Sequence, residues 1–578
     1  MTTGILAAVL ALLLLCGCGA NRRLSGSALD WLQLQGQTQA DEMPPFDQIV
    51  YERPDVSGLQ ARVAELRLAL ESGKRYRTVT GLLDACYEDY YHFLTMNNLA
   101  YIRSCQDLTD AYYTREAAWC DEQFAAVAQT MEDMLYACGT SDLAQKLERQ
   151  YFWEGFAAEY GDDSEAVYDG ELLALLQEES VLVTHYRTLM ANPTIQADGG
   201  EVDLYSHLAE ADDEAYYEGL MQFYRKYNEE LAGLYIELVQ LRCRMAEKLG
   251  YDSYEQMAYD YSFQRDYSPE QAEAYLQDIR TWIVPLYREL TEEDYEIGDG
   301  GFLSTERLHR ALESGAAAMG GSIEEAFRFM DDYDLYDIRV SAAKAADSFQ
   351  VYLTDYEAPF LFLSAEGRLR DLINYSHEFG HYVDAYVNYD ADETVDVSET
   401  FSQAMEYLML GCLDAVLSEE EQEELYRIKM LDTLDLYAQQ ASFAEFEHIV
   451  YSTDPETLSV DFLNELFLRM TREYGYYDGY SEEYYAVSWT DISHFFEMPF
   501  YIIAYPVSND IAMQIYELEQ RRPGAGLEKY LEILPRAYSG LVNTVSAGGL
   551  ESPFAPGRVE KVAEDLWQRL GLPAAAAA

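Results

Sequence analysis

The sequence predicts a mostly α-helical fold with a small β-sheet, on three observations. Helical periodicity of apolar residues dominates the chain after about residue 48. Helix-start signatures recur along the chain, and a strand pattern stands out only at residues 348–364. With 578 residues, 49% hydrophobic and 25% charged, the chain has a globular composition and room for several domains.

The helical elements are recognised by their faces and their caps. The segment "SGLQARVAELRLALESG" places its apolar residues on one helical face. In "SPEQAEAYLQDIRTWIVPLYREL", Ser268 is the expected N-cap, Pro269 takes the first helical position and Gln271 completes a capping box. The segment "GSIEEAFRF" repeats that signature, with Ser322 three residues before Glu325. We therefore expect helices to begin at both places.

The strand pattern is the segment "SFQVYLTDYEAPFLFLS", which is rich in aromatic and β-branched residues. Pro359 cannot donate a ladder hydrogen bond, so we expect part of this segment to be an edge strand. An edge strand can pair with an extended peptide. A small structural hairpin is the simpler interpretation, and the periodicity favours it.

The N-terminus predicts export. An apolar run from Ile5 to Leu15 fits the core of a signal peptide and is short for a membrane span. The following "LCGC" resembles a bacterial lipoprotein lipobox with Cys18 as the lipidated residue. We expect residues 1–18 to be a signal peptide, residues 19–48 a tether, and the folded part to be extracytoplasmic and membrane-anchored. An uncleaved anchor is the alternative, because the run lacks a basic segment before it.

Charge and cysteine content narrow the function further. The chain has 39 Lys+Arg against 104 Asp+Glu, a formal charge of −65, which repels phosphate backbones and disfavours nucleic-acid binding. A cationic substrate and a merely well-solvated surface both fit this charge, and we favour the second. Beyond the lipobox, six cysteines form no C-x-x-C pair, so a structural zinc site is not expected.

The chemistry is concentrated in "LINYSHEFGHYVD", which holds two of the eight histidines. His377 and His381 are four residues apart, so in a helix they share one face. With Glu378 between them they form H-E-x-x-H, in which two imidazoles bind a metal and the carboxylate is a general base. Gly380 is costly inside a helix, by about 1 kcal/mol relative to Ala, which indicates a close approach by another element.

A third ligand is expected nearby, because catalytic zinc usually takes three protein ligands and leaves one position open. After a short acidic loop comes "SETFSQAMEYLML", which predicts a helix returning antiparallel to the first. Its Glu399 is our candidate, on one face with Ser402, Gln403 and Glu406 as partners that orient it. If Glu399 is not the ligand, Glu406 or Asp396 replaces it.

The sequence around these residues resembles the oligoendopeptidase F and thimet oligopeptidase family of zinc metallopeptidases. The segments "SHEFGH" and "SETFSQAMEY" carry the resemblance, and "YLTDYEAPFLFLSAEGRLRDL", "WTDISHFFEMPFYIIAYPVS" and "YSPEQAEAYLQDIRTWIVPLY" agree with it. It covers the chain from Tyr251 to the C-terminus, and the earlier half in general helical character. The resemblance implies that Glu399 is the third zinc ligand.

The resemblance also implies which residues donate hydrogen bonds to the substrate. We call these residues, His494, Tyr501 and Tyr505, the acid side of the site. His494 falls where the family has a hydrogen-bond donor, and Tyr501 and Tyr505 fall where it has tyrosines that contact the substrate carbonyl. Phenol and imidazole groups are donors suited to a tetrahedral oxyanion. The sequence departs from the family at Asp384, where a further histidine is usual, and this departure concerns substrate preference.

The expected protein is thus a two-lobed helical zincin-like peptidase with a deep substrate channel and a small sheet beside the metal helix. Residues 49–260 would form an N-terminal helical region and residues 261–578 the catalytic region. The expected activity is hydrolysis of short unfolded peptides by an endopeptidase with one Zn2+ per chain. A helical zinc carboxypeptidase and a non-catalytic peptide-binding lipoprotein are the alternatives.

Overall fold

The computed structural model of the chain describes residues 43–571, apart from 153–154, 161–169, 192, 198, 205–206, 209–210, 212, 293–297, 342, 390–393, 477–480 and 536–539. The expected signal peptide, Cys18 and most of the expected tether lie outside the described residues. Among the helices that are described, none has the length and apolar character needed to cross a membrane.

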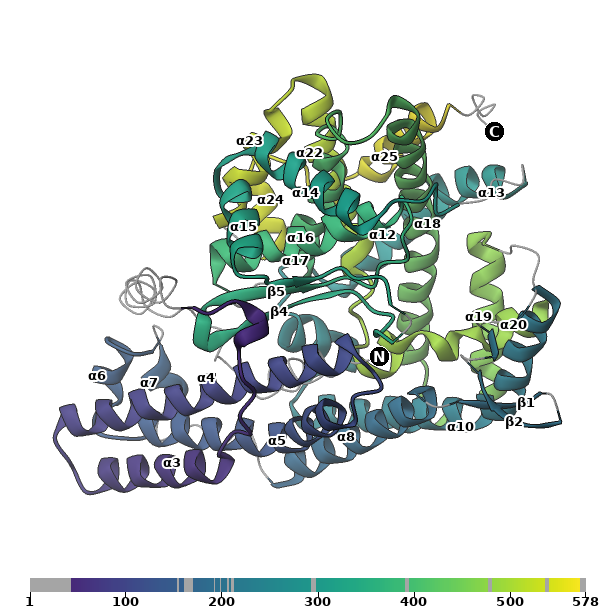
Figure 1. Ribbon diagram of the computed structural model, residues 1–578. Coiled ribbons are helices and arrows are strands. Elements are labelled where there is room, and N and C mark those ends of the chain that lie inside the picture. The colour runs from purple at the N-terminus through teal and green to yellow at the C-terminus, as the bar shows by residue number, and fades with distance from the viewer. Residues whose placement is uncertain are drawn as a thin grey trace.

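The protein is mostly α-helical and has two helical lobes, as expected (Figure 1). The lower lobe in Figure 1 contains the long helices α4 and α10, which lie beneath the sheet. Its elements are η1 (Phe46–Gln48), α3 (Val56–Glu71), α4 (Tyr76–Gln106), α5 (Ala111–Gly139), α6 (Ala144–Glu148), α7 (Phe156–Glu159), α8 (Gly170–Ala191), β1 (Thr194–Ala197), β2 (Gly200–Asp203), α10 (Asp213–Lys248), α19 (Val460–Tyr474), α20 (Glu482–Val487), η5 (Ser488–Asp491) and α21 (Ser493–Glu497).

The upper lobe surrounds the metal-motif helix α16, and its helix α18 extends down to the lower lobe (Figure 1). Its elements are α12 (Pro269–Trp282), α13 (Val284–Glu292), α14 (Thr305–Met319), α15 (Gly321–Asp332), α16 (Asp371–Asn388), α17 (Val395–Met409), α18 (Glu419–Ser452), α22 (Ala504–Arg521), α23 (Ala525–Ile533), α24 (Leu541–Ala547) and α25 (Arg558–Leu570). Shorter connecting elements are α11 (Tyr254–Met257), η2 (Ala258–Ser262) and η4 (Pro455–Thr457).

A three-stranded sheet lies between the lobes, with the order β3 (Tyr336–Asp337), β5 (Ala358–Phe362), β4 (Phe349–Leu353). Part of the predicted segment is an edge strand, namely β4, but the assignment of the edge to Pro359 is wrong, because Pro359 lies in β5, the central strand. Proline is tolerated there since β3 is short and pairs only with Leu361 and Phe362, so it does not reach Pro359. On the other side β5 pairs antiparallel with β4, including Tyr352 opposite Pro359.

The outer edge of β4 is covered by the lower lobe. The side-chain amide of Asn98, on α4, donates to the backbone carbonyl of Tyr352 over 2.8 Å. The hydroxyl of Thr95 accepts from the backbone N–H of Asp355 at the end of the hairpin over 2.7 Å. Because these contacts cover the free edge of β4, they favour a structural hairpin over a strand that pairs with an extended peptide.

The two capping predictions have different outcomes. Ser268 and Gln271 form the predicted capping box at the start of α12, with Pro269 in the first turn. The prediction at Ser322 is wrong, because α15 begins at Gly321 with Gly320 as its N-cap and no side-chain cap. Gly320 and Gly321 have φ of 67° and 57°, a conformation that favours glycine, and the chain enters the helix through them.

The core forms two clusters. The smaller cluster lies mainly among helices α3, α4 and α5, includes Leu59, Leu83 and Met134, and extends to α6 and α7. The larger cluster continues from α10 through the sheet and α16 to the C-terminal helices. The six cysteines beyond the lipobox are all in the described part; none is in a disulfide, and four are buried.

Candidate metal centre and active site

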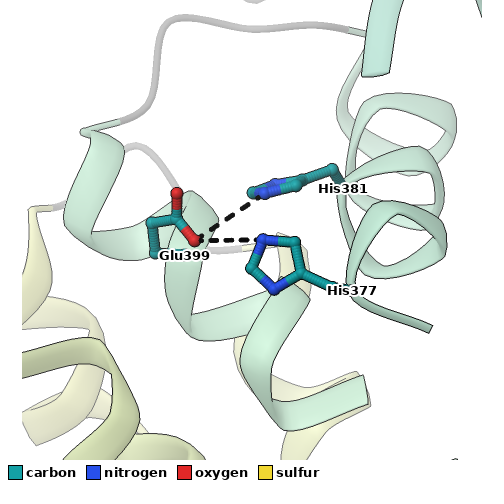
Figure 2. Close-up of side chains that lie close together, drawn as sticks. All are labelled: His377, His381 and Glu399. Atoms are coloured by element: carbon teal, nitrogen blue, oxygen red, sulfur yellow. Dashed lines mark ion pairs between the residues drawn. The ribbon is translucent and has the colours of Figure 1, made fainter. Parts of the chain in front are cut away.

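The metal motif lies in the middle of α16. His377 and His381 project from one face of that helix toward α17 (Figure 2). The opposite face is held in the core by Phe379, Tyr382 and Val383, which are fully buried. This division follows from the sequence, because residues four apart in a helix share a face.

Gly380 allows α17 to approach α16 closely. A Cβ at this position would lie 2.5 Å from Cα of Ser402 and 2.7 Å from the carbonyl oxygen of Phe401, both on α17. Real Cβ atoms do not approach backbone this closely, so any other residue would push the two helices apart. The close approach that the sequence indicated is therefore present, and it brings Glu399 to the histidines.

Three side chains meet between the two helices. Oε2 of Glu399 lies 3.5 Å from Nε2 of His377 and 3.8 Å from Nε2 of His381 (Figure 2). Ligands about 2.1 Å from a tetrahedral zinc ion are about 3.4 Å from one another. All three donor atoms lie within 4.8 Å of one another, so the set fits a metal ion that contacts all of them.

The other ring nitrogens of the histidines are occupied. Nδ1 of His377 lies 2.7 Å from Oε1 of Glu406, and Nδ1 of His381 lies 3.0 Å from Oγ of Ser398. Such contacts hold the imidazole ring and leave Nε2 for the metal. Glu406 was expected to be an orienting partner of the site, whereas Ser398 was missed.

Glu399 is itself oriented by neighbouring side chains. The Ser402 hydroxyl donates to its Oε2 over 3.0 Å, and the Tyr501 hydroxyl donates to its Oε1 over 2.8 Å. Glu399 is 3% exposed, so these donors replace the water that a free carboxylate would bind. Gln403, the remaining expected partner, instead donates to the backbone carbonyl of Tyr505 over 3.2 Å.

The two reserve candidates for the third ligand have other partners. Glu406 faces Nδ1 of His377, on the side of the ring away from Nε2. Asp396 accepts from Nε of Arg265 over 3.1 Å and from the hydroxyl of Tyr267 over 2.9 Å. Among the described residues, Glu399 is therefore the carboxylate that groups with both histidines.

Glu378, the candidate base, is buried beside these groups with 8% of its surface exposed. Burial raises the pKa of its carboxyl group to about 7, with further contributions from the charges of Glu399 and Glu406. His377 lowers this pKa in part, because it is the nearby positive charge. A carboxyl group with a pKa near neutrality can both accept and return a proton.

The predicted acid-side residues gather next to Glu399. Nε2 of His494 lies 3.3 Å from the hydroxyl of Tyr505, and the ring centroids of His494 and Tyr501 are 5.3 Å apart. Burial lowers the pKa of His494 to about 4, so its imidazole is neutral at neutral pH. All three residues thus lie at one site with the metal candidates, as the resemblance implied, and a neutral imidazole can still donate one hydrogen bond.

The acid side is held from the lower lobe and from α18. The buried guanidinium of Arg242, on α10, donates to the backbone carbonyls of Phe495 and Phe496 beside His494. Oε1 of Glu447, on α18, accepts the backbone N–H of Phe500 over 2.9 Å. Phe500 has a φ of 69°, which is strained for a non-glycine residue, and this contact supports the turn before Tyr501. Neither support is apparent from the sequence, because both partners lie far from His494 and Tyr501 along the chain.

Asp384, where the family usually has a histidine, is buried in the last part of α16. Its Oδ1 accepts from the side-chain amide of Asn388 over 2.7 Å. That amide also donates to the backbone carbonyl of Leu534 over 3.0 Å. Asp384 therefore takes part in joining α16 to the segment after α23.

Comparison with known proteins gives consistent matches. The sequence profile of the Peptidase M3 N-terminal domain matches residues 46–158, and that of Peptidase family M3 matches residues 333–541. The second match contains every candidate metal and acid-side residue. A search of curated proteins found no match.

Solved structures share the fold along nearly the whole chain. PZ peptidase A with an inhibitor has 22% identity and a TM-score of 0.76, covering 91% of this chain and 99% of its own. A protein assigned as oligoendopeptidase F has 24% identity and a TM-score of 0.76, with 92% and 99% covered. Another so assigned, from Bacillus anthracis str. Ames, has 24% identity and a TM-score of 0.73, with 92% and 98% covered.

Proposed function

The chain belongs to peptidase family M3, and we propose that it is a zinc-dependent endopeptidase acting on short unfolded peptides. Family membership makes it a metallopeptidase, a hydrolase of peptide bonds. The observation that carries the finer proposal is the position of Glu399, whose Oε2 lies 3.5 and 3.8 Å from Nε2 of the two motif histidines. That grouping supports one catalytic metal ion per chain.

His377, His381 and Glu399 would hold the metal. A set of two imidazoles and one carboxylate suits zinc, and catalytic zinc sites use three such ligands with one open position. When bound, zinc supplies a Lewis acid that polarises the substrate carbonyl and activates water.

Glu378 would act as the general base and then as the general acid. It is next to a ligand in sequence and is buried, so its carboxylate takes a proton from the attacking water. It then returns that proton to the amine nitrogen as the peptide bond breaks. The overall reaction consumes one water molecule and yields a new carboxyl and a new amino terminus.

His494, Tyr501 and Tyr505 would stabilise the oxyanion. The Tyr501 hydroxyl lies 2.8 Å from Oε1 of Glu399, and the rings of His494 and Tyr505 lie next to that of Tyr501. Donors that are fixed before the reaction stabilise charge that develops in the transition state. The hydroxyl groups of the two tyrosines have different partners, since that of Tyr505 contacts His494 and not Glu399.

An endopeptidase is favoured over a carboxypeptidase because the side chain of a nearby arginine, Arg265, is buried and already paired with a carboxylate. A carboxypeptidase needs a cationic side chain to bind the free carboxylate of its substrate. Arg265 reaches the start of α17, but its side chain is fully buried and pairs with Asp396. The remaining alternative, a binding protein without chemistry, is disfavoured because Glu378 and all three candidate ligands are present.

A peptide blocked at both ends tests this proposal. Cleavage of an N-acetylated and C-amidated peptide of about ten residues is expected, followed by mass spectrometry of the two products. An exopeptidase leaves such a peptide intact, and a binding protein retains it uncut. Glu378→Gln is the matched control, because it keeps the shape of the side chain and removes the base.

We also propose that the protein is an exported lipoprotein attached to the membrane through Cys18. The support is the apolar run followed by "LCGC" in the sequence. Replacing Cys18 with Ser should move the protein from the membrane fraction to the soluble fraction and abolish labelling with a palmitate analogue. Unchanged membrane association with no lipid label would instead indicate an uncleaved anchor.

A further inference from the structure

A buried lysine lies behind the metal ligands. The side chain of Lys429, on α18, is 3% exposed, and its Nζ lies 2.6 Å from Oε2 of Glu406. The other carboxylate oxygen of Glu406 lies 2.7 Å from Nδ1 of His377. A continuous chain of polar contacts therefore runs from α18 through α17 to the candidate ligand on α16.

The position of Lys429 is fixed by its surroundings. Its Nζ lies 4.4 Å from the centroid of the Tyr407 ring, a cation–π contact. The Tyr407 hydroxyl is in turn 2.6 Å from Oγ1 of Thr433, one helical turn along α18. Lys429 thus presents its ammonium group to Glu406 from a rigid position.

Glu406 needs this partner for two physical reasons. Its carboxylate is 7% exposed and lies in a site with two more acidic side chains, Glu378 and Glu399, so an unpaired charge there is costly. The terminal torsion of a glutamate side chain is also broad, so one contact with His377 does not fix the carboxylate plane. With one oxygen on Lys429, the other is directed to the imidazole.

The two histidines differ in this respect. Nδ1 of His381 contacts the hydroxyl of Ser398, a neutral group on α17, over 3.0 Å. Nδ1 of His377 contacts a carboxylate that is paired with an ammonium group. Through Nδ1, His377 is therefore connected to a third helix, whereas His381 is connected to α17.

From this geometry we infer that Lys429 is a positioning residue of the metal site, which fixes the ring of His377 through Glu406. The inference rests on the proposed role of His377 as a zinc ligand. Lys429 would act through Glu406 and not as a ligand itself. Its effect is on zinc affinity, because it holds Nε2 of His377 toward Glu399.

Zinc affinity measured by competition with a chelator tests the inference without reference to activity. Lys429→Met, of similar length and without charge, should weaken zinc binding by about 10–100-fold, the usual cost of losing such a partner. Glu406→Gln should weaken it by a similar factor. The double variant should bind zinc no more weakly than Glu406→Gln alone, because coupled residues are not additive.

Lys344 provides a matched control. It is also a buried lysine, with its Nζ donating to Oδ1 of Asp337 over 2.9 Å and to the backbone carbonyls of Asp337 and Leu363. Lys344→Met should lower the melting temperature while leaving zinc affinity within about twofold of wild type. A loss of zinc affinity that follows from general destabilisation would appear in both lysine variants.

Three results would overturn the inference. These are a Lys429→Met protein with zinc affinity within about twofold of wild type, an equal loss in Lys344→Met, or additive losses in the double variant. If Lys429→Met does not fold, Lys429→Gln keeps N–H donors without the charge, and it should bind zinc more weakly than wild type; affinity within about twofold of wild type would overturn the inference in the same way. A wild-type protein that binds zinc but cuts no peptide would contradict the proposed function without contradicting this inference.

Discussion

The metal side and the acid side of the site are built by different means. On the metal side, three candidate ligands come from two adjacent helices that touch at Gly380, where a Cβ would lie 2.5 Å from the backbone of α17. On the acid side, His494 and Tyr501 come from a short helix and a turn that contains Phe500 at a φ of 69°. One side is fixed by helix geometry, and the other by contacts from distant segments.

The two sides also differ in charge, since one contains ionised groups and the other neutral ones. The metal side pairs ionised groups, among them Glu406 with Lys429. On the acid side, burial lowers the pKa of His494 to about 4 and raises that of Tyr501 well above its usual value, so both are neutral at neutral pH. The difference teaches that metal binding and transition-state stabilisation should be separable by mutation.

The largest effect on the metal side is expected from Glu399→Ala. Loss of a ligand should weaken zinc binding by more than the roughly 100-fold that loss of an orienting partner costs, and activity should fall with it. Metal content after dialysis and chelator competition measure this. Wild-type metal content in the variant would transfer the ligand role to Glu406 or Asp396.

Glu378→Gln should separate chemistry from metal binding. Loss of the general base is expected to lower kcat by about 10²–10⁴-fold while bound metal stays near one equivalent per chain. The measurement is steady-state kinetics with metal analysis of the same sample. If the metal is lost as well, Glu378 acts on the metal side as a ligand or a structural group.

His494→Ala and Tyr501→Phe should each lower kcat by about 10²–10³-fold, as expected for one oxyanion donor. They should change KM less than kcat, because the charge they meet develops only in the transition state. Zinc affinity should be unchanged. Tyr501 sharpens the comparison, since it also donates to Glu399, and a fall in zinc affinity equal to that in kcat would assign it to the metal side.

Gly380→Ala should loosen the metal side without touching a ligand. Overpacking at the contact between α16 and α17 is expected to lower the free energy of unfolding by about 1–3 kcal/mol and to weaken zinc binding. Denaturant unfolding and chelator competition measure the two effects. Gly81→Ala is the control, because Gly81 lies in α4 with no atom within 4 Å of an added Cβ, so it should not be destabilised.

Tyr505→Phe should have the smallest effect. Its hydroxyl contacts His494 over 3.3 Å, and a hydrogen bond of about 1 kcal/mol corresponds to a loss of about tenfold or less in kcat. A loss greater than that of His494→Ala would make Tyr505 the main donor. If His494→Ala, Tyr501→Phe and Tyr505→Phe all kept more than about half of wild-type kcat, the acid-side assignment would be wrong.

The grouping of His377, His381 and Glu399 could be predicted from the sequence because its geometry is local. The spacing of His377 and His381 fixes their common face, and Gly380 indicated the close contact that brings Glu399 to them. Helix starts were predicted at both sites, but the serine cap is present only at Ser268; near Ser322 two glycines bring the chain into the helix instead.

The acid side was predicted through resemblance and not through spacing. Its supports come from far along the chain, since Arg242 is 253 residues from Phe495 and Glu447 is 53 residues from Phe500. No local pattern connects such residues, because their contact arises only when helices far apart in the sequence pack together. Lys429 could not be singled out for the same reason, because its contact with Glu406 joins two helices and its sequence position shows only one lysine on a long helix.

X-ray diffraction at the zinc absorption edge tests the central claim most directly. Crystals grown with zinc should give one strong anomalous peak per chain, between Nε2 of His377, Nε2 of His381 and the carboxylate of Glu399, whose Oε2 is already 3.5 and 3.8 Å from those nitrogens. Glu406 should remain on Nδ1 of His377. A peak elsewhere, or one coordinated by Glu406 or Asp396 in place of Glu399, would contradict the account.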